Sequence, residues 1–128
     1  MPYEKPVYIA SYLRTEQNDD GIDIDIFDKP KPYLINFQPV SDYLDYQEYG
    51  AEVSSVKRAY VRKEQYYGVF KPRDRVYLND ENNPCDCLED IVESENNNRC
   101  LKANYEIVKC PLRGLYIQID AKKIKKKG

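Results

Sequence analysis

The sequence contains no histidine and no tryptophan, and it has only one methionine among its 128 residues. Without histidine, the chain lacks the commonest general base near neutral pH, every Ser-His or Cys-His nucleophile pair, and the commonest metal ligand. A glycine-rich phosphate-binding loop is missing as well. These absences exclude most hydrolase chemistry, and we predict that the protein is not an enzyme.

Long apolar runs are also missing. The stretch from Met1 to Gln17 has no apolar segment between a positive start and small residues, and no stretch approaches the length of a membrane span. We therefore expect no signal peptide and no membrane partner, and we expect the chain to be made and kept in the cytoplasm. Cysteines in that compartment stay reduced unless they hold a metal.

Tyrosine is the residue that the chain uses most distinctively, with 13 copies against three phenylalanines. Its ring is buried while its hydroxyl stays at a boundary, which suits half-buried sheets and contact surfaces. The net charge of −2, with 33% charged residues, indicates a mixed surface and not the basic field of a free-standing nucleic-acid binder. The length predicts a single domain spanning 1–128.

Alternation of apolar and polar residues predicts a mainly β fold. The expected strands are Val7 to Thr15, Ile22 to Ile26, Tyr33 to Val40, a stretch within Ala51 to Gln65, Arg73 to Leu78, Tyr105 to Cys110 and Leu115 to Ala121. The stretch within Ala51 to Gln65 also fits a helix, but a following hairpin partner favours a strand. The polar run from Glu16 to Gly21 predicts a β-hairpin turn between the first two strands.

Three further segments complete the predicted fold, a small antiparallel β-barrel or sandwich of about six strands. Ser41 is suited to cap a short α-helix from Asp42 to Tyr49, which Gly50 ends. Two prolines in Asp28 to Pro32 predict a connector that cannot join a strand ladder. The Asn- and Asp-rich segment within 79–104 predicts a long loop insertion with one amphipathic turn at Leu88, Ile91 and Val92, and 122–128 predicts a flexible basic tail.

The four cysteines could hold a zinc ion. They are Cys85, Cys87, Cys100 and Cys110. Four thiolates bind Zn²⁺ tetrahedrally, and a metal would stabilise the polar loop. Their spacing does not match the paired C-x₂-C of zinc ribbons, however, so free and partly buried thiols are the favoured interpretation and no cofactor is expected.

Two charged patterns admit a binding interpretation beside a plainer one. Aspartates at 19, 20, 23, 25 and 28 suit a cation site, but alternating Asp is usual on the wet side of a strand. Lysines and arginines interleave with tyrosines between Lys57 and Tyr77, as on single-strand nucleic-acid platforms. Nearby acids dilute that field, so a protein interface or a solvated sheet is favoured.

The order of these pieces resembles the head-tail connector proteins of long-tailed bacteriophages, the head-closure or stopper proteins and head-tail adaptors. The matching pieces are the hairpin Tyr12 to Phe27, Phe37-Gln38-Pro39-Val40-Ser41, the helix Asp42 to Gly50, the strand Val56 to Arg62, Asp74-Arg75-Val76-Tyr77, Tyr105-Glu106-Ile107-Val108, and Leu115 to Ala121. The stretch from Asn79 to Asn104 departs from the family, in which a tight hairpin joins the corresponding strands.

The resemblance implies a structural protein of the virion neck, assembled in the cytoplasm of the host bacterium. Such a protein forms an oligomeric ring, closes the filled head and offers a docking surface to the tail. The implied partners are other copies of the chain, a portal or adaptor protein, a tail terminator or tail-completion protein, and packaged DNA in the channel. The alternative is a small cytoplasmic binding module with a cysteine-held zinc loop.

We hypothesise that a few residues on the helix and the following strand line the ring interface or the lumen. They are Tyr43, Tyr46, Tyr49, Arg58 and Arg62. The competing interpretation, equally favoured, is that the tyrosines pack the helix onto its own barrel.

Overall fold

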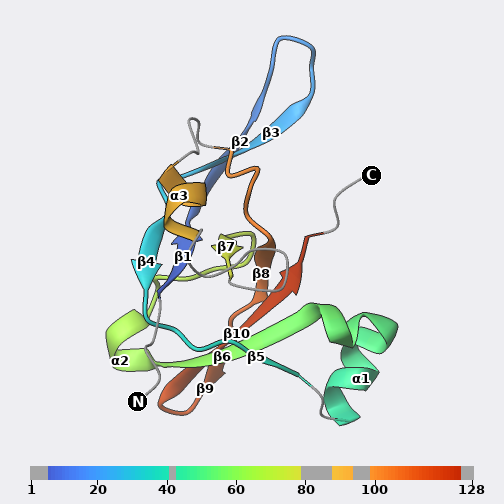
Figure 1. The fold of residues 1–128 in the computed structure, drawn as a ribbon. Coiled ribbons are helices and arrows are strands. Elements are labelled where there is room, and N and C mark those ends of the chain that lie inside the picture. Colours follow the sequence, from blue (N-terminus) through green and yellow to red (C-terminus); the bar gives the residue numbers. More distant parts are fainter. Residues whose placement is uncertain (1–5, 41–42, 79–87, 94–98, 125–128) are drawn as a thin grey trace.

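A computed structural model describes residues 6–40, 43–78, 88–93 and 99–124, and shows a mainly β protein (Figure 1). Its strands are β1 (Val7–Ala10), β2 (Tyr12–Gln17), β3 (Asp23–Phe27), β4 (Lys31–Tyr33), β5 (Gln38–Pro39), β6 (Val56–Arg62), β7 (Arg75–Tyr77), β8 (Tyr105–Lys109), β9 (Leu112–Arg113) and β10 (Tyr116–Lys123). Its helices are α1 (Tyr43–Tyr49), the 3₁₀ helix η1 (Gly50–Ser55), α2 (Lys63–Tyr66) and α3 (Leu88–Glu93). Within the described ranges, no helix is long and apolar enough to cross a membrane.

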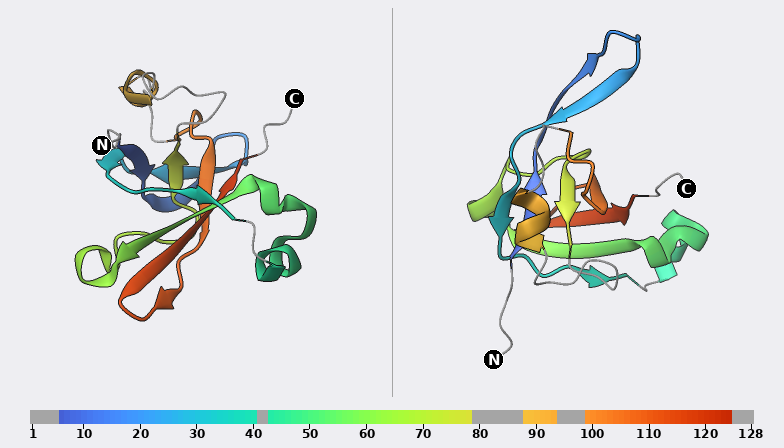
Figure 2. Two further views of the ribbon diagram at one scale, coloured as in Figure 1. Left: turned by 60° about the horizontal axis from the view of Figure 1, so that its bottom comes forward. Right: turned by 45° about the horizontal axis from the view of Figure 1, so that its top comes forward.

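The main sheet is antiparallel and has the strand order β4-β1-β7-β8-β10-β6-β5, with β9 added beside β10. Its two edge strands, β4 and β5, follow one another in the sequence. One segment of chain therefore runs from one edge of the sheet to the other, as the two views of Figure 2 show, and the sheet curls into a half-barrel. This confirms the predicted antiparallel β fold.

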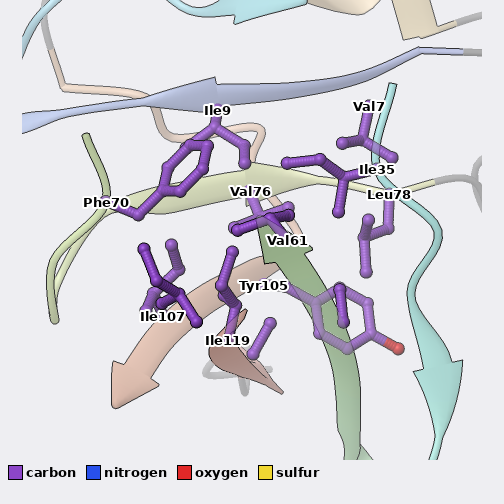
Figure 3. Close-up of a cluster of buried hydrophobic side chains, with 13 residues drawn as sticks. Val7, Ile9, Ile35, Val61, Phe70, Val76, Leu78, Tyr105, Ile107 and Ile119 are labelled. Atoms are coloured by element: carbon purple, nitrogen blue, oxygen red, sulfur yellow. The ribbon is translucent and has the colours of Figure 1, made fainter. Parts of the chain in front are cut away.

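The inner face of the curled sheet holds the larger core. Alternate residues of β1, β7, β8 and β10, such as Ile9, Val76, Ile107 and Ile119, point toward one another there and are at most 2% exposed (Figure 3). Every second residue of a strand points into this core, since successive side chains point to opposite faces of a strand.

The opposite face of β1 and β7 is buried as well. Ala10 and Tyr77 lie there with Phe27 and with Val92 of α3. The turn predicted at Leu88, Ile91 and Val92 is the helix α3, which packs beside β1 with Val92 buried and Ile91 half-buried; the side chain of Leu88 lies outside the described part.

The first predicted strand is wrong in its extent. The chain leaves the main sheet at Ser11, so that β1 ends at Ala10 and Tyr12 begins β2, which pairs only with β3 in a separate two-stranded sheet. The pairing register also shifts between Tyr12 and Arg14. Leu13, expected on the dry face, is therefore 49% exposed.

The prolines are less disruptive than predicted. Lys31–Tyr33 forms β4 and pairs with β1, although it contains Pro32. This is tolerated because β4 is an edge strand, where a missing N–H costs no ladder hydrogen bond. The single strand expected over Tyr33 to Val40 is instead split into β4 and β5.

Three other boundaries differ from the prediction. The stretch Ala51 to Gln65 contains a strand, but η1 precedes it and α2 ends it. The turn expected at Pro111 to Gly114 includes the short strand β9. β10 continues to Lys123, so the basic tail begins later than predicted, and residues 125–128 lie outside the described part of the chain.

Candidate functional site

A buried polar network joins α1 to the outer face of the sheet. Arg58 of β6 and Asp120 of β10 are direct cross-strand partners, so their side chains lie on the same face. The guanidinium of Arg58 donates to Asp120 through Nε (2.7 Å to Oδ1) and Nη2 (3.0 Å to Oδ2). It also donates to both carboxylate oxygens of Asp45 on α1, at 2.7 and 3.2 Å. One guanidinium thus ties the helix to two neighbouring strands.

Other side chains complete the coordination of Asp120. The hydroxyl of Tyr49, at the end of α1, donates to Asp120 Oδ2 at 2.7 Å, and Gln118 Nε2 donates to Oδ1 at 3.1 Å. Lys109 Nζ lies 3.8 Å from Oδ2 and also bonds Glu48 of α1. Asp120 is 0% exposed and yet fully paired.

The network lowers the pKa of Asp120 and raises those of Tyr49 and Arg58. Burial raises the pKa of Asp120, but hydrogen bonds from Arg58 and Tyr49 and the charge of Arg58 outweigh it, so the pKa of this carboxyl lies below its ordinary value. The pKa of Tyr49 is raised, first by burial and then by its hydrogen bond to Asp120. The hydrogen bond to Asp120 is also the largest cause of the raised pKa of Arg58.

This arrangement suits anchoring better than catalysis. Arg58 and Asp120 are held charged and Tyr49 neutral, and no buried side-chain nitrogen or oxygen in the described ranges lacks a hydrogen-bond partner. A general acid or base needs a pKa near the working pH and a free approach to its substrate. Neither condition is met in this network.

A second polar cluster fixes the base of the β2–β3 hairpin. Arg73 stacks its guanidinium 4.2 Å from the ring centre of Tyr12 and donates to Asp25 Oδ1 at 2.8 Å. Arg75 lies 5.1 Å from the ring centre of Phe27 and pairs with Glu106 of β8 at 2.9 Å. The hairpin is therefore attached to the main sheet by its first and last residues.

Asp74 lies between those two arginines in the sequence and links the hairpin to the main sheet, because it directly precedes β7 and bonds to Tyr12 of β2. It is 0% exposed, and its carboxylate accepts from the backbone N–H of Tyr12 at 2.8 Å and of Lys71 at 3.1 Å. Burial raises the pKa of Asp74, although these hydrogen bonds and the Lys71 charge oppose the rise. Arg73 adopts a φ of +81°, a conformation that ordinary residues rarely take, and its N–H donates to the carbonyl of Ile107.

Beyond its base, the hairpin projects away from the rest of the chain (Figure 1). Every residue of β2 after Tyr12 is exposed, and Ile22 at the start of the returning chain is 60% exposed. A two-stranded sheet alone is only marginally stable in water. The turn is nevertheless well formed, because Asn18 accepts from the N–H of Asp20 and of Ile22.

The structure separates the hypothesised interface residues. Tyr49 and Arg58 are brought together, and both bond to groups of their own chain, which fits the interpretation that the helix packs on its own barrel. Arg62 lies further along β6, exposed, with Glu64 as its ion-pair partner. The side chains of Tyr43 and Tyr46 lie outside the described part.

The cation and metal hypotheses find no cluster in the described ranges, where no group of three or more His, Cys, Asp or Glu residues could hold a metal ion. Asp25 is instead paired with Arg73. Cys100 is buried and Cys110 half-buried, whereas Cys85 and Cys87 lie outside those ranges, so the zinc site stays a prediction.

The basic and aromatic mix between Lys57 and Tyr77 divides in two. Arg58, Arg73 and Arg75 are committed to the contacts above, and Tyr77 is buried. Of the remainder, Tyr60 and Arg62 are exposed and share the outer face of β6 with Arg58.

Comparison with known proteins identifies no relative: no protein-family model, curated protein or solved structure matches the chain. Sequence reasoning had missed Asp45 and Asp120. Asp120 occupies a polar position in a cleanly alternating strand, which is the same pattern that a solvated aspartate would give.

Proposed function

We propose that this chain is a structural protein of the neck of a long-tailed bacteriophage. It forms a ring between the portal or adaptor protein and the tail, closes the filled head and presents a docking surface to the tail. The observation that carries this proposal is the β2–β3 hairpin, which is fixed at its base and exposed along β2 and at its tip. An arm with open strand edges and exposed isoleucine supports a role in assembly, because such surfaces are stabilised by a partner.

The buried network around Arg58 supports a non-enzymatic role. Its charged groups hold α1 against β6 and β10 and are not presented to a substrate. A ring component must keep its shape while its surfaces are loaded by neighbours, and a helix fixed by several charge-assisted hydrogen bonds suits that demand.

The fold also offers the unlike faces that a ring requires. Head-to-tail contacts join different surfaces of neighbouring subunits and close into a ring when the rotation permits. The projecting hairpin and the β9–β10 turn lie at opposite ends of the molecule in Figure 1. The further partners of the proposed ring are the portal or adaptor protein, a tail terminator or completion protein, and packaged DNA.

Immunolabelling tests the proposal directly. Antibody raised against this chain should label the neck of virions in negative-stain electron microscopy, and purified protein should form rings in the same microscope. Particles without any label, together with purified protein that stays monomeric, would contradict it. Stoichiometric zinc in that monomer would favour the alternative of a binding module with a cysteine-held zinc loop.

A further inference from the structure

Two uncovered surfaces of this chain are complementary to each other. The first is the hairpin. Ile24 and Ile26 of β3 lie opposite Glu16 and Arg14 of β2, and Ile22 extends the same face by the alternation of the strand. These isoleucines are half-buried or exposed, although they belong to the residue types most often found inside proteins.

The hairpin is also acidic. Its only cation between Tyr12 and Phe27 is Arg14, which pairs with Glu16 on the same strand. Its carboxylates are Glu16, Asp19, Asp20, Asp23 and Asp25. Of these, Asp25 is engaged by Arg73, while Asp19 and Asp20 are exposed at the tip. The hairpin therefore presents apolar area beside negative charge.

The second surface, here called the tyrosine–arginine patch, consists of Tyr60, Arg62, Arg113 and Tyr116. Tyr116 lies directly opposite Arg62 on one side and Arg113 on the other, so the three side chains share the outer face of the sheet. Tyr60 lies one pair further along β6 on that same face, opposite Gln118. Tyr60 is 57% and Tyr116 44% exposed.

The patch has the composition of an interface. Tyrosine and arginine are enriched where proteins bind one another and carry much of the binding energy there. Leu112 and Leu115, in the β9–β10 turn beside the patch, are 50% and 76% exposed. The patch therefore presents apolar area beside two arginines, of which Arg62 also pairs with the exposed Glu64, and this complements the acidic hairpin.

We infer that the β2–β3 hairpin of one copy docks on the tyrosine–arginine patch of a second copy. The hairpin and the β9–β10 turn, beside which the patch lies, are at opposite ends of the molecule in Figure 1, so the hairpin does not reach the patch of its own chain. The contact is then heterologous, and each copy gives one surface and receives the other. This identifies the subunit contact of the proposed ring, and its closure into a ring rests on that proposed function.

Complementary variants test the contact. Asp19→Lys with Asp20→Lys reverses the charge of the tip, and Tyr60→Ser with Arg62→Glu removes the centre of the patch; all four residues are exposed, so both variants should fold, as circular dichroism and thermal melting can confirm. We expect each variant alone to be monomeric. Mixed together, they should form a dimer and nothing larger, because only one intact hairpin and one intact patch remain to meet.

Matched controls change the same charges elsewhere. Glu93→Lys on α3 and Lys29→Glu after β3 are exposed substitutions away from the patch and the hairpin tip. Both should assemble as the wild type does in analytical ultracentrifugation over a concentration series.

The outcomes separate this inference from the proposed ring. If the wild type forms rings and both double variants form them as well, the hairpin contact is wrong and the ring function stands. If the wild type instead forms open filaments, and neither double variant does, the hairpin contact is supported and the closed ring is contradicted. A wild type that stays monomeric at every concentration would contradict both.

Discussion

Arg58 bonds two carboxylates at once, Asp120 on the neighbouring strand and Asp45 on α1. Its side chain is only 16% exposed, and those of the two aspartates are 7% exposed or less. Removing the guanidinium would leave two buried carboxylates without their main cation. Losing one partner of a buried pair is far more costly than losing a surface ion pair.

We therefore expect Arg58→Met to lower the free energy of unfolding by about 3–5 kcal/mol. The measurement is urea denaturation followed by circular dichroism. Arg62→Met is the matched control: it lies on the same strand and face, but its pair with Glu64 is exposed, so its cost should stay below about 1 kcal/mol. Equal losses in the two variants would show that the network does not anchor α1.

The lowered pKa of Asp120 predicts an acid-dependent contribution to stability. A carboxyl whose pKa is lower in the folded than in the unfolded chain stabilises the fold above its unfolded pKa of about 3.9, and this contribution disappears as the pH falls through the folded value. The raised pKa of Asp74 acts in the opposite sense, since that group favours the fold when protonated. The contribution of Asp120 must therefore be isolated by comparison with a variant.

We expect the difference in unfolding free energy between wild type and Asp120→Asn to be largest between about pH 5 and 7 and to shrink below about pH 4. Urea denaturation across that range measures it, and Asp74 cancels because both proteins contain it. A difference that is constant with pH would mean that the charge of Asp120 contributes nothing.

The hairpin base gives a local prediction. Arg73→Ala removes the stacking on Tyr12 and the bond to Asp25, which together contribute about 1–2 kcal/mol. Backbone amides of β2 and β3 should then exchange hydrogen roughly tenfold faster, while those of β6 and β10 keep their rates. Arg14→Ala, which removes only an exposed pair with Glu16, should leave the hairpin rates unchanged. If the amides of β2 and β3 exchange at the wild-type rate in Arg73→Ala, the contacts of Arg73 do not hold the hairpin on the main sheet.

The fold was predictable where one local pattern decides it. Ile117, Ile119 and Ala121 alternate with polar residues and do form a strand with a dry face. The break between β1 and β2 at Ser11 could not be predicted, because the alternation of apolar and polar residues continues through Ser11. The break is set by strand pairing: β1 pairs with β4 and β7, whereas β2 pairs with β3.

The polar network shows the same limit at the site. Periodicity places Arg58 and Asp120 on the polar face of their strands, which is correct. It cannot show that α1 covers that face, since this depends on where the chain returns after β5. Arg58 and Asp120 have the sequence pattern of solvated residues, but in the tertiary structure they are largely buried and hold α1 on the sheet.

The inner core should respond strongly to a cavity. Ile119 is 0% exposed and belongs to the main core cluster, so Ile119→Ala should cost about 2–5 kcal/mol. Leu115→Ala provides the control on the same β9–β10 hairpin, because Leu115 is 76% exposed and its loss should cost about 0.5 kcal/mol or less. Chemical denaturation of both variants measures the contrast, and a small cost for Ile119→Ala would be inconsistent with the packing seen in Figure 3.

Cys110 should be a poor nucleophile in the folded protein. Burial, with smaller contributions from the negative charges of Asp74 and Asp120, raises the pKa of this thiol to about 12. At pH 8 its thiolate fraction is then more than about 1,000-fold below that of a free cysteine, and only the thiolate reacts with alkylating reagents. A short pulse of iodoacetamide followed by peptide mass spectrometry should leave Cys110 unmodified in native protein and label it fully in urea. Labelling of native Cys110 at the rate of a free thiol would contradict its placement against the core.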